Sequence, residues 1–111
     1  MKRQSKNDSE LADLGRFSEP ALLVLISLAE GPKHGYAIGE DVFGISGMRL
    51  GPGTLYGAIS RLESRKFIEA LEPNERRIPY RLTAHGVTLL RARLTNLERV
   101  ARVGSERLAS A

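Results

Sequence analysis

Side chains that can bind an anion gather in three short stretches of the 111-residue chain. The third stretch carries two adjacent arginines, Arg76 and Arg77, among residues typical of a turn. Adjacent guanidinium groups on an exposed turn suit a narrow DNA minor groove or the phosphates beside it. The other two stretches add further candidate contacts, which are Lys33, His34, Tyr36, Arg49, Thr54, Tyr56, Ser60 and Arg61. These residue types favour contact with nucleic acid phosphates and base edges.

Catalysis receives little support from the same sequence. The chain has no cysteine, and its two histidines, His34 and His85, lie far apart without a carboxylate cluster beside them. Two imidazoles fall short of the three or four ligands that a zinc site needs. We therefore expect no catalytic residue, no metal site and no cofactor.

The charge of the chain is unevenly distributed. The net charge is +4 and the sequence pI ≈ 9.9. Residues 60–111 hold 11 basic and 6 acidic side chains, whereas residues 1–59 hold 6 basic and 7 acidic ones. This excess fits a polyanionic partner, and it fits equally well an arginine-rich helix that is simply solvated.

The sequence before the arginine pair predicts a polar start and two helices. Residues 1–16 are polar and form a tail or a short helix. A helix begins near Ser18, is apolar nearly all round, and stops at Gly31-Pro32, so it belongs at the centre of the core. A second helix is expected from His34 or Gly35 to Phe43, followed by a loop.

A third helix is predicted from Pro52 to about Lys66. Leu55, Ile59 and Leu62 follow i, i+4, i+7 spacing and form one apolar stripe. At about 100° per residue, the opposite side presents a small and polar face, made of Gly57, Ser60, Arg61 and Ser64. Such a face can lie in a groove without steric conflict.

The periodicity changes after the third helix. Residues 67–72 alternate as a strand, residues 73–77 have the composition of a turn, and residues 78–82 form a second short strand. Pro79 is typical of an edge strand. Three helices followed by a hairpin predict a mainly α winged helix-turn-helix over residues 17–83, with the arginine pair near the tip of the wing.

The last helix is expected over residues 84–111, with Thr83 as its cap. Its apolar residues repeat as a heptad seam, made of Val87, Leu90, Leu94, Leu97, Ala101, Gly104 and Leu108. Roughly 25 residues make a helix near 37 Å long, which exceeds what a small core needs. We infer a dimerisation helix and a homodimer. The alternative is a helix that folds back over its own domain.

Three motifs stand in order along most of the chain. Residues 28–38 read LAEGPKHGYAI, residues 50–63 read LGPGTLYGAISRLE, and residues 80–86 read YRLTAHG. Together they resemble the second helix, the recognition helix and the wing-to-helix junction of PadR-like transcriptional regulators. Gly51 and Gly57 stand where that family more usually has serine and proline.

The resemblance implies a function and a set of partners. Members of the compact branch of this family are bacterial or archaeal DNA-binding repressors that pair through a single C-terminal helix. A homodimer of this kind is expected to bind a palindromic operator in double-stranded DNA. A small-molecule effector that releases the protein from DNA belongs to the same expectation.

Two other function classes remain open at this point. A winged helix can also serve as a protein-interaction module, and a basic chain can bind nucleic acid without sequence preference.

The longest apolar stretch, residues 20–29, has about half the length that spans a bilayer. The polar N-terminus lacks the apolar segment of a signal peptide. We therefore expect a cytoplasmic protein with no membrane partner.

Overall fold

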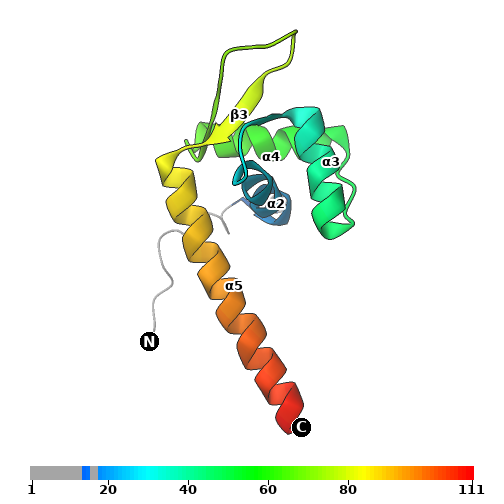
Figure 1. Cartoon of the computed structure of the whole chain (residues 1–111), viewed down its shortest axis with the longest axis vertical. Helices are drawn as coiled ribbons and strands as arrows, with labels where there is room; N and C mark the ends of the chain where they lie inside the picture. Colours follow the sequence, from blue (N-terminus) through cyan, green and yellow to red (C-terminus); the bar gives the residue numbers. More distant parts are fainter. Residues whose placement is uncertain (1–13, 16–17) are drawn as a thin grey trace.

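The computed structural model describes residues 14–15 and 18–111. Figure 1 shows their order as helices, a small sheet and one long helix: α2 (Ser18–Leu28), β1 (Lys33–His34), α3 (Gly35–Ser46), α4 (Pro52–Ser64), β2 (Ile68–Ala70), β3 (Pro79–Leu82) and α5 (Ala84–Ser110). This is the winged helix-turn-helix with a long C-terminal helix that the sequence predicts. The tail or short helix expected over residues 1–16 lies almost wholly outside the described residues.

Helix α2 occupies the centre of the core, as its apolar composition predicts. Ala21, Val24, Leu25 and Leu28 are buried on it. The helix contacts α3, α4, α5 and β3, and so it is enclosed by the elements that Figure 1 shows around it. It ends at Leu28, slightly before the Gly31-Pro32 stop, because the chain turns through residues 29–30 first.

The wing is a three-stranded antiparallel sheet rather than the two-stranded hairpin that we expected. The strand order is β1-β3-β2, with Lys33 opposite Tyr80 and Ile68 opposite Leu82. Pro79 therefore lies on the central strand and not on an edge. Proline is tolerated there because it is the first residue of β3, where a missing N–H costs little.

Helix α3 runs past Phe43 to Ser46, which corrects the expected boundary. Gly44 does not stop the helix. The end comes at Gly47, which adopts the left-handed region at φ 73° and donates its N–H to the Phe43 carbonyl at 2.8 Å. Glycine adopts this conformation without a Cβ penalty, so the helix terminates where the αL cap becomes available.

The tip of the wing is a two-residue turn. The backbone of Asn74 and Arg77 is joined by two hydrogen bonds of 2.7 and 2.9 Å. Between them, Glu75 and Arg76 have φ of 52° and 69°. Two consecutive positive φ values are those of a type I′ hairpin turn, which Asn-Gly usually fills. Here two side-chain-bearing residues occupy it.

Helix α5 begins against the domain and then leaves it. Thr83 caps it, as predicted, by accepting the Gly86 N–H at 3.0 Å. A Cβ on Gly86 would collide with the Phe67 carbonyl, so glycine permits the close approach of the helix to the sheet. From Arg91 onward no α5 residue is buried, and Figure 1 shows the helix extending away from the other elements.

Within residues 14–15 and 18–111, no helix is both long and apolar enough to cross a bilayer.

Candidate nucleic-acid interface

Helix α4 divides into a core face and an exposed face. Leu55, Ala58, Ile59 and Leu62 are buried among the core residues. The residues predicted to contact DNA from this helix are all exposed: Thr54, Tyr56, Ser60 and Arg61. The Arg61 Nη1 donates to the Gly57 carbonyl at 3.1 Å, one turn back on the same helix. The guanidinium therefore lies along the exposed face.

Tyr56 packs across the backbone at the start of α3. A Cβ built on Gly35 would lie 2.6 and 2.7 Å from the ring carbons Cε1 and Cζ of Tyr56, and closer still to its hydroxyl. Only glycine leaves room for the ring. Tyr56 nevertheless remains 50% exposed.

His34 joins the start of α3 to the wing. It is the N-cap of α3, and its Nδ1 accepts the Ala37 N–H at 3.4 Å. The Nη1 of Arg77 lies 3.1 Å from Nε2 of the same ring. Arginine is always a donor and a neutral imidazole has one acceptor nitrogen. The ring therefore satisfies one of these two donors at a time, and the shorter contact is with Arg77.

The two wing arginines have different environments. Arg77 is held by His34, although we expected both guanidinium groups at the exposed tip. Arg76 is exposed and has no hydrogen-bond or ion-pair partner in the part of the chain that the structure describes. Arg76 is thus the wing arginine whose charge is available to a ligand, whereas the guanidinium of Arg77 is held in place by its contact with His34.

The remaining basic candidates differ in availability. Arg49 is exposed, but its guanidinium pairs with Glu40 at 3.0 Å and lies 3.9 Å from the centroid of the Phe43 ring. Lys33 is mostly buried, pairs with Glu30 at 2.8 Å, and donates to the Ser27 carbonyl. The ammonium group of Lys33 is therefore already enclosed, and its expected contact with the DNA backbone stays a prediction.

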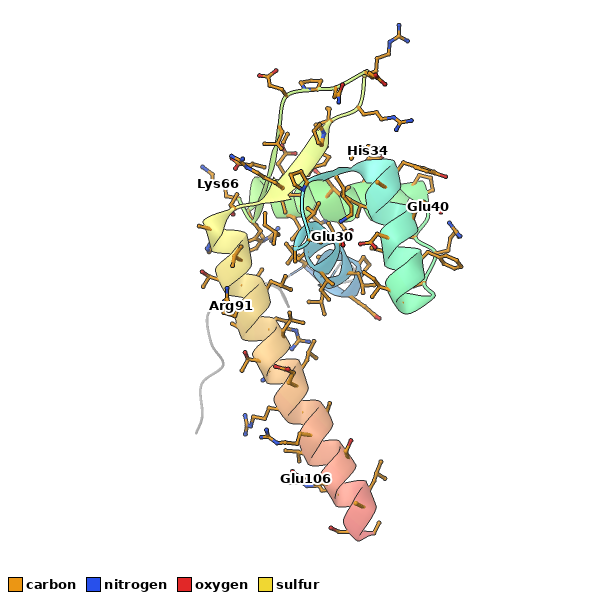
Figure 2. The ribbon with its side chains drawn as sticks, viewed as in Figure 1. Glu30, His34, Glu40, Lys66, Arg91 and Glu106 are labelled. Atoms are coloured by element: carbon orange, nitrogen blue, oxygen red, sulfur yellow. The ribbon has the colours of Figure 1, made fainter. Side chains whose placement is uncertain are left out.

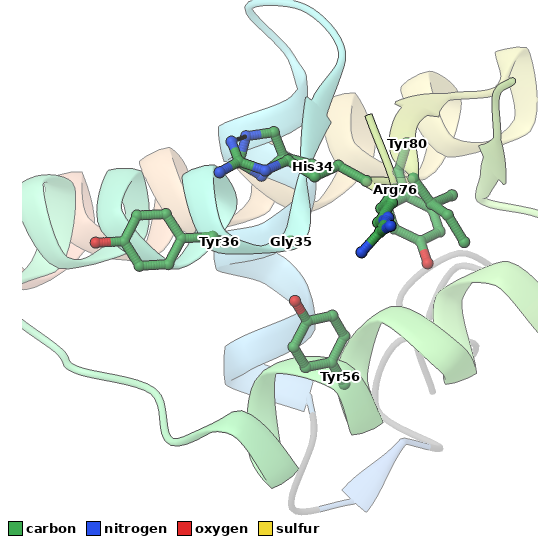
Figure 3. A pocket seen from close by; sticks show the side chains of 8 residues that line it. His34, Gly35, Tyr36, Tyr56, Arg76 and Tyr80 are labelled. Carbon is green, nitrogen blue, oxygen red and sulfur yellow. Dashed lines mark hydrogen bonds between the residues drawn. The ribbon is translucent and has the colours of Figure 1, made fainter. Parts of the chain in front are cut away.

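A pocket of about 360 Å³ lies between the start of α3, the start of α4 and the wing. Its lining contains five of the predicted contact residues together with three that the sequence did not single out: His34, Gly35, Tyr36, Tyr56, Arg76, Arg77, Ile78 and Tyr80. Figure 3 shows the Tyr56 and Tyr80 hydroxyls turned toward the space between the elements, whereas the Tyr36 hydroxyl points away from it. Tyr36 is 68% exposed.

Tyr80 is the most informative of the residues that the sequence analysis missed. It lies on β3 opposite Lys33, so strand pairing brings it beside His34 and Gly35. Burial raises the pKa of Tyr80, and the negative potential of Glu63 and the nearby Tyr56 raise it further. The Tyr80 hydroxyl therefore keeps its proton to a higher pH than an ordinary tyrosine does.

His85 belongs to the junction between wing and helix, as expected. Its ring stacks on Phe67 with the centroids 4.6 Å apart. No group of three or more metal-ligating side chains occurs among the described residues.

The heptad seam on α5 is only partly exposed. Leu94 is 37% and Leu108 78% exposed, and Val87 is 38% exposed. Leu90 differs from the expectation: it is 5% exposed and belongs to the core of the domain. The seam turns inward there because the first turns of α5 pack on α2 and β3. Leu97 is half-buried and Ala101 is exposed.

Beyond Leu90 no residue of the long helix is buried. Figure 2 shows Arg91 and Glu106 on α5 at increasing distance from the wing and from α3. Val100, which the seam did not include, is 60% exposed. An exposed apolar stripe is typical of an interface.

Comparison with known proteins identifies relatives of the whole fold. The model of the transcriptional regulator PadR-like family matches residues 24–92. An uncharacterised 37.1 kDa protein from a Streptomyces fradiae transposon is 44% identical over 85 residues, which cover 77% of this chain and 25% of that protein. The chain thus spans about a quarter of the length of that curated relative.

Solved structures show the same arrangement. A transcriptional regulator from Clostridium thermocellum is 26% identical with a TM-score of 0.71, and the match covers 85% of this chain and 96% of that one. A PadR family transcription regulator from Clostridium difficile is 28% identical with a TM-score of 0.72, over 79% and 96% of the two chains.

Proposed function

The chain belongs to the PadR-like family of transcriptional regulators, and from that premise we propose that it represses transcription as a homodimer bound to a palindromic operator. Its class is therefore that of a DNA-binding regulator. The observation that carries the proposal is the exposed polar face of α4. The opposite, apolar face of the same helix packs against the core and so fixes the helix in place. A helix held in this way is stiff enough to enter a major groove.

Base recognition is assigned to the exposed face of α4. Arg61 and Ser60 are its central polar side chains, and Thr54 lies in its first turn. An arginine that pairs with a guanine edge contributes about 1–3 kcal/mol of discrimination against other bases. The wing arginines supply contacts to the flanking backbone, with Arg76 as the available charge.

The homodimer is proposed to form through α5. This helix has 27 residues, about 40 Å of length, and exposed apolar side chains at Leu94 and Leu108. Pairing two copies around a two-fold axis would cover both stripes at once. The two recognition helices would then reach successive major grooves, with half-site centres about 10 bp apart or a multiple of it.

An effector is proposed to act through the same pairing. The dimer would have one geometry that fits the operator and one that does not. A small molecule that binds one of these two geometries more tightly changes the affinity for the operator by the ratio of its own two affinities.

The direct test is a titration of fluorescent duplex DNA from upstream of its own gene, with a scrambled duplex as the comparison. Anisotropy at two salt concentrations gives affinity and salt slope together. We expect the upstream duplex to bind at least about 100-fold tighter, within the usual range for specific sites. Arg61→Ala should remove part of this preference. Arg99→Ala, which removes the same charge from the outer face of α5, should not.

Two outcomes would contradict the proposal. Equal and weak binding of both duplexes would favour a winged helix that serves a protein partner. Tight binding without sequence preference, or tighter binding to duplex RNA, would favour a general nucleic-acid binder, since a helix shaped for the major groove fits A-form RNA poorly.

A further inference from the structure

All three tyrosines of the chain line one pocket. Tyr36, Tyr56 and Tyr80 come from α3, α4 and β3, and the chain has no other tyrosine and no tryptophan. Two arginines and His34 line the same space. Six of the eight lining residues therefore carry a hydrogen-bonding side chain, and none carries a carboxylate.

The floor of the pocket adds backbone donors. Gly35 and Tyr36 are the first residues of α3, a helix of 12 residues, so their N–H groups have no acceptor inside the helix. Gly35 has no side chain, and the ring of Tyr56 occupies the space where one would stand. Positive potential at this helix end and the two guanidinium groups act in the same direction.

Arg77 is already placed for this role. Its Nη1 contacts His34 Nε2 at 3.1 Å, which fixes the guanidinium at the rim of the pocket. A guanidinium has five N–H donors, so one contact with His34 leaves the others for an anion. A positioned donor loses less conformational entropy on binding than a freely moving one.

From these observations we propose that the pocket is a binding site for the phosphate group of a nucleotide. The hydroxyls of Tyr56 and Tyr80 and the guanidinium of Arg77 would donate to the phosphate oxygens. A volume of about 360 Å³ exceeds what a phosphate group fills, and leaves room for an attached sugar beside the apolar Ile78.

The same chemistry has two sources, a phosphodiester of the operator and a free phosphate ester. The pocket lies between the starts of α3 and α4 and the wing, and Tyr56 of the exposed α4 face lines it, so a DNA strand held by α4 and the wing would pass over it. The DNA source rests on the proposed function, whereas binding of a free phosphate ester does not. A free ester in the pocket would compete directly with the operator.

The first experiment uses the full chain without DNA. Tyrosine is replaced throughout by meta-fluorotyrosine, so fluorine NMR gives one signal for each of the three tyrosines. Dimethyl phosphate and ribose phosphate are titrated, with neutral trimethyl phosphate as the uncharged control. We expect saturable shifts of the Tyr56 and Tyr80 signals with the two anions only. Tyr80→Phe should weaken binding about tenfold, since a hydrogen bond to a charged group is lost.

Thr88→Val is the matched control, because it also removes one hydroxyl, and that hydroxyl bonds the Ala84 carbonyl on α5, outside the pocket lining. It should leave the affinity for both phosphate esters unchanged. Equal losses for the two variants would overturn the assignment of the phosphate to the Tyr56–Tyr80 side.

The second experiment places single neutral methylphosphonates along the operator. One position in each half-site should lower affinity about tenfold for the unmodified protein and for Thr88→Val. The Tyr80→Phe variant already lacks the contact with that phosphate, so the same methylphosphonate should lower its affinity for the operator little further.

The outcomes separate the sources. Effects in both experiments support a backbone phosphate as occupant, and an effect without DNA alone supports a free phosphate ester. If neither the fluorine signals nor any single methylphosphonate responds, the pocket is not a phosphate site. Failure to bind any operator, with the fluorine shifts present, would remove the proposed function and leave this inference standing.

Discussion

At the scale of single residues, Gly35 has the sharpest role in the structure. It is buried where the Tyr56 ring crosses the start of α3, and a Cβ there would lie 2.6 Å from the nearest ring carbon. The far end of a half-exposed tyrosine can swing away, so the conflict displaces Tyr56 rather than the helix. The residue thus controls where a candidate contact lies, because it has no side chain.

Gly35→Ala should therefore weaken operator binding about tenfold, the value of one lost hydrogen bond to a phosphate. The free energy of unfolding should change little, because alanine favours the helix by up to about 1 kcal/mol and offsets lost packing. Anisotropy and thermal unfolding measure the two quantities. Gly44→Ala is the control: it meets nothing within 4 Å, lies inside α3, and should raise stability without changing affinity.

At the scale of elements, the wing turn shows a conflict between local stability and function. Glu75 and Arg76 both adopt positive φ, which costs a residue with a side chain roughly 1–2 kcal/mol relative to glycine. Such a conformation persists where the side chain is useful. Arg76 has no partner in the described part of the chain, which fits a side chain kept for a ligand.

Arg76→Gly should stabilise the hairpin by about 1 kcal/mol and raise the unfolding midpoint by about 4 °C. It should at the same time lower DNA affinity, because one charge per protomer is lost. Glu75→Asn relieves the same turn while keeping Arg76, and should stabilise the protein without weakening binding. If Arg76→Gly lowers the unfolding midpoint, the turn is not under the strain argued here.

The elements also show what local sequence patterns can and cannot predict. The stripes of α2 and α4 and the Thr83 cap are predictable because they depend on residues within a few positions of each other. Strand β1 is two residues long and has no periodicity to detect. The pocket requires Tyr80 to pair opposite Lys33, a tertiary contact that no short motif encodes. Equally, a heptad pattern cannot tell that Leu90 faces its own domain.

Because Leu90 faces the core of its own domain, the test of the α5 interface uses Leu94 instead. Leu94→Asp places a charge in the exposed part of the seam, beyond the core-facing Leu90, and should separate the protomers without unfolding the domain. Thr95→Asp adds the same charge one position outside the seam and should leave the dimer intact. Sedimentation gives the oligomeric state and thermal unfolding gives the stability. A Leu94→Asp protein that stays dimeric at micromolar concentration would place the interface elsewhere.

At the scale of the whole molecule, the basic excess is shared between two surfaces. Five arginines lie on α5, far from the wing: Arg91, Arg93, Arg99, Arg102 and Arg107. Arg81 on the wing pairs with Glu69 at 2.8 Å. The charge excess is therefore not confined to the α4–wing surface, and net charge alone overstates the positive potential of that surface.

The salt dependence of binding should reflect this division. Arg76→Ala in a dimer removes two phosphate contacts, so the slope of log affinity against log salt should become shallower by about 2. Arg99→Ala removes as much formal charge and should leave the slope unchanged. Equal effects of the two variants would mean that overall charge, rather than the α4–wing surface, governs binding.

The final prediction concerns the distance between the two halves of a dimer. Each α5 is a continuous helix from Thr83 to its end, so a pair joined along the exposed seam holds its recognition helices at a fixed separation and rotation. Inserting half a helical turn, about 5 bp, between the half-sites places them on opposite faces of the duplex. Affinity should then fall to that of a single half-site.

Inserting a full turn, about 10 bp, returns the two half-sites to the same face of the duplex but leaves them further apart. A rigid dimer should still fail to bind both half-sites. Monomers that bind independently would tolerate either insertion, so full affinity for the two altered sites would exclude a rigid dimer through α5.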